Sequence, residues 1–300
     1  MDLAELYPGF DAVTLAGDGV DIFCRIGGEG PPLVLLHGFP QTHAEWHRIA
    51  PELARHFTLV IPDLRGYGQS GCAETIEDHA TYSKRAMARD IVAIMAARGF
   101  ERFAFAGHDR GARVGYRLAL DHPERVERLV ALDIVPTYDM WTDWSVARAM
   151  QVYHWLFLAQ PHPLPEMLIE NASSAYLDHT IASWSGTKDL SAFDPRAMDH
   201  YRAFFAQPER LHATCEDYRA GQDYDFEADR ASIEIGAKLA CPTQVLWGAA
   251  GIPAQGGGPL EAWKKWAPDL VGEPIESGHF LPEENPQATL AAMLPFLTGA

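Results

Sequence analysis

Five short apolar runs, each about the length of one buried strand, recur along this chain of 300 residues. Continuous apolar runs are typical of strands covered on both faces, as in parallel sheets. A helical pattern of apolar residues separates two of the runs. Because strands that alternate with helices are joined by crossovers, the pattern predicts an α/β fold with a mostly parallel sheet and helices on both faces. The runs are Pro31–Leu36, Phe57–Ile61, Phe103–Ala106, Leu129–Ile134 and Thr243–Trp247.

One long segment, from about Pro136 to Lys238, interrupts the alternation. It contains no clear buried strand and is rich in Trp, Tyr, His and Phe, which favours a helical insertion. We therefore expect a core domain formed by residues 1–135 and 238–300, and an inserted helical cap domain formed by residues 136–237. Such a cap would cover the carboxyl ends of the strands, where open α/β sheets bind ligands.

The charge of the chain excludes several classes of partner. Asp and Glu number 41 against 24 Lys and Arg, a net charge of −17. Such a surface repels phosphate backbones and anionic lipids, so we expect neither nucleic-acid nor membrane partners. The N-terminus has no apolar core and does not read as a signal peptide. We expect a reduced cytoplasmic protein without disulfides, because the cysteines are widely scattered: Cys24, Cys72, Cys215 and Cys241.

The motif Gly107-His108-Asp109-Arg110-Gly111 lies between a buried strand and a helix expected to begin near Ala112. This context is that of the G-x-S-x-G nucleophile elbow, with Asp in place of Ser. A carboxylate is already ionised and can attack a saturated carbon that bears a leaving group, which gives an alkyl ester. The motif predicts Asp109 as the nucleophile.

His279 is the predicted base for the second step, in which water must hydrolyse that ester. It lies between a late strand and a final helix, and a nucleophile followed by a late His is the chain order of such elbow enzymes. The acid that orients His279 should lie between the two in sequence. The loop after Thr243–Trp247 contains no acid, so we assign Asp133. Asp139 and Asp143 are weaker alternatives, which we expect to be solvated in the cap.

Two further groups of residues surround the predicted nucleophile. The N–H groups of Phe39 and Arg110 would form an oxyanion hole for the ester carbonyl. Arg110 and Arg113 occupy the first turn of a helix, where cations oppose the helix dipole. Because Arg binds carboxylates through two parallel hydrogen bonds, the pair predicts a clamp for an anionic substrate. Surface ion pairing is the alternative for the two arginines.

Over essentially its whole length the sequence resembles the fluoroacetate dehalogenases, which have the α/β-hydrolase fold. The most specific matching motif is GHDRGARV at Gly107–Val114. The others are HGFPQTH (His37–His43), YHW (Tyr153–Trp155), DLSAFDPRA (Asp189–Ala197), CEDYRAG (Cys215–Gly221) and ESGHFLPEE (Glu276–Glu284).

The resemblance implies conversion of fluoroacetate to glycolate and fluoride. It also implies that Arg110 and Arg113 bind the substrate carboxylate. His154, Trp155 and Tyr218 would donate hydrogen bonds to the departing fluoride, and Trp184 would line the pocket. No cofactor and no metal are expected, and the resemblance favours a homodimer.

Two alternatives stay open at this point. An epoxide hydrolase would use the same Asp nucleophile, with Tyr153 and Tyr218 protonating the epoxide. A ligand receptor on the same scaffold would bind without turnover, although it would not need to retain Asp109, Asp133 and His279 together.

Overall fold

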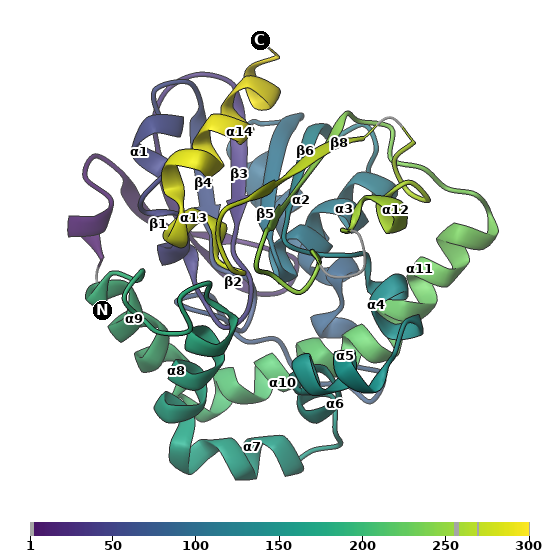
Figure 1. The fold of residues 1–300 in the computed structure, drawn as a ribbon. Coiled ribbons are helices and arrows are strands. Elements are labelled where there is room, and N and C mark those ends of the chain that lie inside the picture. The colour runs from purple at the N-terminus through teal and green to yellow at the C-terminus, as the bar shows by residue number, and fades with distance from the viewer. Residues whose placement is uncertain (1–2, 255–257, 269, 300) are drawn as a thin grey trace.

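An eight-stranded sheet forms the centre of the molecule, in a computed structural model that describes residues 3–254, 258–268 and 270–299 (Figure 1). The strand order is β1-β2-β4-β3-β5-β6-β7-β8; β2 pairs antiparallel with β1 and β4, and all other neighbours are parallel. The predicted α/β fold with a mostly parallel sheet is therefore confirmed. The strands are β1 (Asp11–Ala16), β2 (Asp21–Gly27), β3 (Pro32–Leu36), β4 (Thr58–Pro62), β5 (Phe103–His108), β6 (Val126–Leu132), β7 (Thr243–Gly248) and β8 (Val271–Ile275).

The apolar runs of the sequence form the middle of this sheet. Every residue of β5 and of β7 is buried, because helices cover both faces. Val34 of β3 pairs with Val60 on one side and Phe105 on the other. Partly buried and exposed side chains alternate most clearly in the edge strand β1, where Val13 and Leu15 are partly buried and their neighbours are exposed.

Helices of the core pack on the two faces of the sheet. In Figure 1, α2 and α3 lie behind it, and α13 and α14 lie in front. The N-terminus of α2 is capped by Ser83, whose Oγ accepts a hydrogen bond from the Ala86 N–H at 3.2 Å. The core helices are α1 (Ala50–Leu53), α2 (Lys84–Ala97), α3 (Arg110–Asp121), α12 (Leu260–Trp263), α13 (Leu281–Glu284) and α14 (Pro286–Thr298), with 3₁₀ turns η1 (Ala4–Leu6), η2 (His43–Trp46) and η3 (Ala80–Tyr82).

A second, wholly helical layer lies between β6 and β7 in sequence and occupies the lower half of Figure 1. Its helices fall within residues 136–237, the range for which the sequence predicts a cap. They are α4 (Thr137–Thr142), α5 (Val146–Gln151), α6 (Tyr153–Leu158), α7 (Leu164–Ile169), η4 (Glu170–Ala172), α8 (Ser173–Trp184), α9 (Pro195–Phe205), α10 (Pro208–Gln222) and α11 (Tyr224–Glu234).

Buried polar contacts fasten the helical layer to the core. Lys84, at the start of α2, forms ion pairs with Asp217 of α10 and Asp225 of α11. Tyr67 donates a hydrogen bond to Asp217 at 2.8 Å, and Tyr116 donates one to Asp229 at 2.8 Å. Removing one partner of a buried ion pair typically costs about 3–5 kcal/mol, so these contacts hold the helical layer in place.

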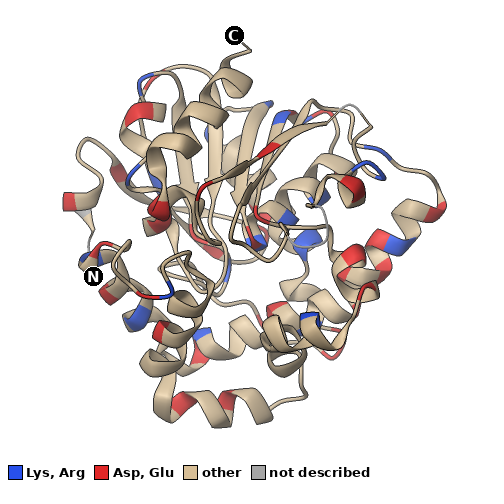
Figure 2. Cartoon of the chain, in the orientation of Figure 1, with Lys and Arg blue, Asp and Glu red and all other residues tan. Residues whose placement is uncertain are grey.

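Charged residues of both signs occur along the chain in both layers (Figure 2). Within the described ranges, no helix combines the length and the apolar character needed to cross a membrane.

Candidate active site

Asp109 lies at the turn between β5 and α3, in a backbone conformation that side chains rarely adopt (φ 42°, ψ −111°). Such conformations cost about 1–3 kcal/mol and persist only where the surroundings enforce them. The two glycines of the motif permit the close packing: a Cβ on Gly111 would lie 2.0 Å from the Leu36 carbonyl oxygen, and one on Gly107 2.5 Å from the Ala112 nitrogen. The turn therefore holds the Asp109 carboxylate at the carboxyl end of the sheet.

The charges around Asp109 keep its carboxylate ionised. Burial alone would raise the pKa of Asp109, but Arg110, His279 and Arg113 outweigh burial and hold the pKa below its ordinary value. One carboxylate oxygen, Oδ2, accepts a hydrogen bond from the Phe39 N–H at 3.0 Å. The other oxygen is the one left for attack on a substrate.

His279 and Asp133 form a hydrogen-bonded pair beside Asp109. The His279 Nδ1 lies 2.5 Å from the Asp133 Oδ2, and the Gly248 N–H donates to the Asp133 Oδ1 at 2.8 Å. Because Nδ1 faces a carboxylate, it carries the proton, which leaves Nε2 as the basic nitrogen. Nε2 is buried and makes no hydrogen bond to any described residue. The pair can therefore take a proton from a bound water.

The two alternative acids lie elsewhere. Asp139 pairs with Lys265 at 2.5 Å and accepts a hydrogen bond from the Trp266 indole. Asp143 pairs with Arg148 at 2.6 Å. The prediction that both are solvated is wrong for Asp139, which is 9% exposed. In the part of the chain that the structure describes, the acid hydrogen-bonded to His279 is Asp133.

A cavity of about 50 Å³ lies between Asp109 and the helical layer. This volume suits a ligand of only a few atoms, since one water needs roughly 10–15 Å³ on the same kind of measure. The described residues that line it are Asp109, Arg113, Asp133, Ile134, Val135, Met140, Arg148, Val152, His154, Trp155, Trp184, Ile252, Pro253 and His279.

The two predicted clamp arginines occupy different positions. Both are buried, so they are not surface ion-pair residues. Arg113 lines the cavity, stacks on Trp155 and donates to the Val135 carbonyl at 3.0 Å. Arg110 is not among the described lining residues and lies 3.5 Å above the Tyr218 ring. Its Nε lies 3.6 Å from the buried Asp217 carboxylate, but its three guanidinium nitrogens make no hydrogen bond to the described residues, so buried donors remain for a ligand.

The three predicted halide donors lie close together. The His154 and Tyr218 ring centroids are 5.8 Å apart, as are those of Trp155 and Tyr218. His154 and Trp155 line the cavity, but among the described residues Tyr218 does not. Burial lowers the pKa of His154 well below its ordinary value, so its imidazole is neutral. Its buried Nδ1 makes no hydrogen bond to the described residues.

Sequence reasoning missed Arg148, Ile252 and Pro253, which also line the cavity. Arg148 is a second cation there besides Arg113. It also lines an adjoining outer pocket of about 540 Å³, so its side chain borders both spaces. Nothing in the sequence marks it, because a lone Arg in a short helix usually faces solvent.

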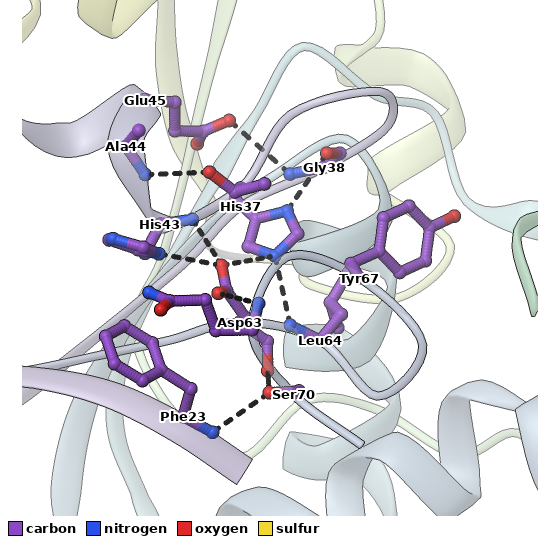
Figure 3. A network of polar contacts seen from close by, with 12 residues as sticks. Phe23, His37, Gly38, His43, Ala44, Glu45, Asp63, Leu64, Tyr67 and Ser70 are labelled. Carbon is purple, nitrogen blue, oxygen red and sulfur yellow. Dashed lines mark hydrogen bonds and ion pairs between the residues drawn. The ribbon is translucent and has the colours of Figure 1, made fainter. Parts of the chain in front are cut away.

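A buried network around Asp63 positions the loop that carries Phe39 (Figure 3). Asp63 follows β4 and accepts hydrogen bonds from the His43 N–H at 2.7 Å and from its Nδ1 at 2.9 Å. The His37 Nε2 accepts from the Leu64 N–H at 3.0 Å. Burial would raise the pKa of Asp63, but His43 and His37 outweigh it and lower the pKa. The ionised network links the loops after β3 and β4.

His108 supports the site from behind the nucleophile. Its Nδ1 lies 3.1 Å from the Glu45 Oε2, and its Nε2 lies 2.9 Å from the His279 carbonyl oxygen. Because both partners are acceptors, both ring nitrogens carry protons. Burial opposes this charge, but Glu45 outweighs burial and raises the pKa of His108 to about 9. The imidazolium thus ties the His279 loop to the core.

Comparison with known proteins agrees with this architecture. The family model for the alpha/beta hydrolase fold matches residues 31–286. The chain is 42% identical to a fluoroacetate dehalogenase from Burkholderia sp, covering 98% of this chain and 96% of the relative. It is 31% identical to a soluble epoxide hydrolase from Corynebacterium sp. (strain C12), covering 90% and 91%.

A solved structure extends the comparison to three dimensions. A mutant of a proposed epoxide hydrolase from Pseudomonas aeruginosa, determined with bound MFA, superimposes with a TM-score of 0.91 at 47% identity. The match covers 98% of this chain and 97% of that one. The chain therefore belongs to the α/β-hydrolase fold family, and over nearly its whole length it is a relative of a fluoroacetate dehalogenase.

Proposed function

We propose that this protein is a hydrolytic dehalogenase of small haloacids, which converts fluoroacetate to glycolate and fluoride. One observation carries the proposal. The ionised Asp109 shares a cavity of about 50 Å³ with a buried cation, Arg113, and with a His279 that is paired to Asp133. This combination suits a small anionic substrate with a leaving group on a saturated carbon.

In the first step, Asp109 attacks the carbon that bears the halogen. A bond forms between a carboxylate oxygen and that carbon, while the carbon–halogen bond breaks and its electron pair leaves with the halide. Arg113 and Arg110, whose donors make no hydrogen bond to the described residues, hold the substrate carboxylate. They also offset its repulsion from Asp109 as the two anions approach.

In the second step, the His279 Nε2 takes a proton from water, and the hydroxide attacks the ester carbon of Asp109. Negative charge develops on the oxygen that the Phe39 N–H already contacts at 3.0 Å. A second donor to this oxygen, the Arg110 N–H, completes the proposed oxyanion hole. Collapse breaks the bond between the ester carbon and the glycolate oxygen, which takes up the proton of the newly formed carboxyl group. This step releases glycolate and regenerates the ionised Asp109, and His279 gives up its proton to bulk water.

Fluoride is a small, strongly hydrated ion, so its departure needs donors that replace water. We assign this role to His154, Trp155 and Tyr218. The neutral His154 has a buried ring nitrogen without a partner among the described residues, and the Trp155 side chain lines the cavity beside it. Tyr218 would join them once a ligand has drawn Arg110 from its ring. Trp184 closes the pocket, with its ring centroid 4.3 Å from that of His154.

The geometry gives less support to an epoxide hydrolase. That reaction needs two tyrosines to protonate the epoxide oxygen, and the candidates are Tyr153 and Tyr218. Tyr153 is 39% exposed and lines a neighbouring pocket in place of the cavity that contains Asp109. Tyr153 is therefore not among the described residues that line the cavity with the nucleophile.

The test is halide release from fluoroacetate, chloroacetate and bromoacetate, measured beside hydrolysis of a small epoxide. We expect multiple turnovers on the haloacetates and little on the epoxide, with Asp109→Asn as the inactive control. Turnover of the epoxide alone would support the alternative enzyme. Binding of haloacetate without halide release would support a receptor. A homodimer and a cytoplasmic location stay predictions.

A further inference from the structure

A second polar pocket, separate from the cavity at Asp109, lies on the outer side of the helical layer. It has a volume of about 720 Å³. It lies where the connection between α6 and α7 meets α10 and the segment before η3, which belongs to the core. It is lined by Thr75, Ile76, Glu77, His79, Ala159, Gln160, Pro161, His162, His212, Glu216, Arg219, Gln222 and Asp223. None of these residues takes part in the proposed reaction.

Three side chains of metal-ligand type converge at this pocket. His162, Glu166 and His212 each offer one ligand atom, and these atoms all lie within 4.8 Å of one another. Among the residues that the structure describes, this is the one such group of three. The His212 Nδ1 already lies 2.9 Å from the Glu166 Oε1, and the two imidazole centroids are 5.2 Å apart. A small shift of the exposed His162 would complete a three-ligand site.

Neighbouring side chains hold two of these three residues in place through hydrogen bonds. The Thr75 Oγ1 lies 2.9 Å from the other nitrogen of His212, Nε2. This contact fixes the ring with Nδ1 toward the group, as partners of metal-bound histidines do. Arg219 contacts both Glu166 oxygens, at 2.8 and 3.0 Å. Oε1 also contacts the His212 Nδ1, whereas Oε2 contacts Arg219 and has a second lone pair available to a cation.

The charge of Arg219 does not preclude a metal ion at this place. Arg219 also pairs with the buried Glu216 at 2.8 Å, so its charge is shared between two carboxylates. Glu166 accepts hydrogen bonds from both terminal guanidinium nitrogens of Arg219, which holds it as a carboxylate, the form that binds metals.

We propose that His162, Glu166 and His212 bind a divalent transition-metal ion, with zinc as the best fit. Two imidazoles and one carboxylate, with a fourth position open to water, form a common zinc ligand set. Imidazole ligands disfavour magnesium and calcium, which prefer oxygen. The ion would join α7, α10 and the connection between α6 and α7. Through Thr75 it would also brace the helical layer against the core.

The test is titration of metal-free protein with zinc by isothermal calorimetry, comparing wild type with His162→Ala. This variant removes an exposed side chain, so the fold should be unaffected, and circular dichroism checks that it is. The matched control is His79→Ala, which removes a histidine of the same pocket outside the ligand group. We expect about one zinc per chain for wild type and for the control, and at least tenfold weaker binding for His162→Ala.

Thermal unfolding gives a second readout that does not depend on dehalogenation. Zinc should raise the unfolding midpoint of wild type and His79→Ala, because an ion that binds only the folded state stabilises it. It should raise the midpoint of His162→Ala and Glu166→Gln much less. Magnesium should leave all four proteins unchanged. Equal zinc binding by wild type and His162→Ala, or no stoichiometric binding by wild type, would overturn the proposal.

Discussion

Replacing Asp133 with Asn should separate the two halves of the proposed reaction. Asn is nearly isosteric with Asp, so its carbonyl oxygen can still accept from the Gly248 N–H, now 2.8 Å from Oδ1. The amide nitrogen would then face the His279 Nδ1, at the position of the present 2.5 Å contact. An NH₂ group can only donate, so His279 must move its proton from Nδ1 to Nε2. In that tautomer the nitrogen nearest the ester cannot act as a base.

The size of the effect follows from this loss. General-base catalysis contributes about 10²–10⁴-fold, and the same Asp→Asn change in a serine protease triad lowers kcat by about 10⁴-fold. We expect turnover of bromoacetate to fall by about 10³–10⁴-fold, or ~4–5.5 kcal/mol at ~1.36 kcal/mol per decade. Attack by Asp109 needs no base, so its rate should change by less than about tenfold.

Rapid-quench measurement of halide, with intact-protein mass on the same samples, tests this expectation. Asp133→Asn should release about one equivalent of halide per active site and gain the mass of one carboxymethyl group. The matched control is Asp139→Asn, which alters a carboxylate paired with Lys265 away from His279 and should turn over like wild type. Loss of the burst in Asp133→Asn would show that His279 serves the first step. Near-normal turnover would show that another acid orients His279.

Three further predictions concern neighbouring residues. Arg113→Ala should lower kcat/KM for bromoacetate by about 100-fold or more, as loss of a buried charged contact does, but lower that for neutral bromoacetamide much less. Trp155→Phe should slow halide release from fluoroacetate more than from bromoacetate in steady-state assays, because bromide leaves with little help from donors. His108 has a pKa raised to about 9, so its charged form stabilises the fold fully below about pH 6.5, its ordinary pKa, and progressively less as the pH rises through 9. His108→Gln should therefore reduce the unfolding free energy near pH 6 by up to about 3 kcal/mol, and by less at pH 9, in urea titrations.

The sheet and the nucleophile elbow could be predicted because short stretches of sequence determine both. A buried parallel strand must be apolar along its whole length, and a close strand-to-helix turn such as that at Asp109 requires glycines at fixed positions. The proximity of Asp133 to His279 could be predicted as well. The loop after the next strand has no acid, and β6 and β7 are neighbours in the sheet, so the remaining acid had to come from the end of β6.

For the inserted layer, the sequence predicts helices but not how these helices are arranged. Four of its helices, α4 to α7, have only six residues each, and nothing in the local sequence determines how the helices of this layer pack against one another. Arg148 therefore could not be placed at the cavity from sequence, although the structure locates it there. Arg110 shows the same limit, because its place beside Asp109 in sequence does not tell which groups its side chain contacts. In the structure its guanidinium lies 3.5 Å from the centroid of the Tyr218 ring, which comes from α10.

Dependence on helix packing also explains why the proposed metal-ligand group could not be recognised in the sequence. Metal motifs are recognisable when the ligands share one helix or turn, and His43 and His47 have such a spacing without the required pattern. In the structure the backbone N–H and the Nδ1 of His43 both contact Asp63, in the network that supports the Phe39 loop. His162 and Glu166 lie four residues apart across a helix start, but His212 comes from a different helix, so only the packing of α7 against α10 brings the three together.

A strongly acidic protein should repel an anionic substrate, but ion pairs in the outer pocket reduce this repulsion. A net charge of −17 would oppose an anion only within a Debye length of about 8 Å at physiological salt, so the charges that matter are those along its path. The outer pocket contains three carboxylates, and each has a basic partner: Asp139 with Lys265, Asp143 with Arg148, and Glu261 with Lys264. The charges of the outer pocket thus nearly cancel, whereas Arg113 in the cavity donates to neutral groups, the Val135 carbonyl and the Thr137 hydroxyl. Selectivity for an anion is then set by the buried cations beside Asp109, which solvent and salt screen least.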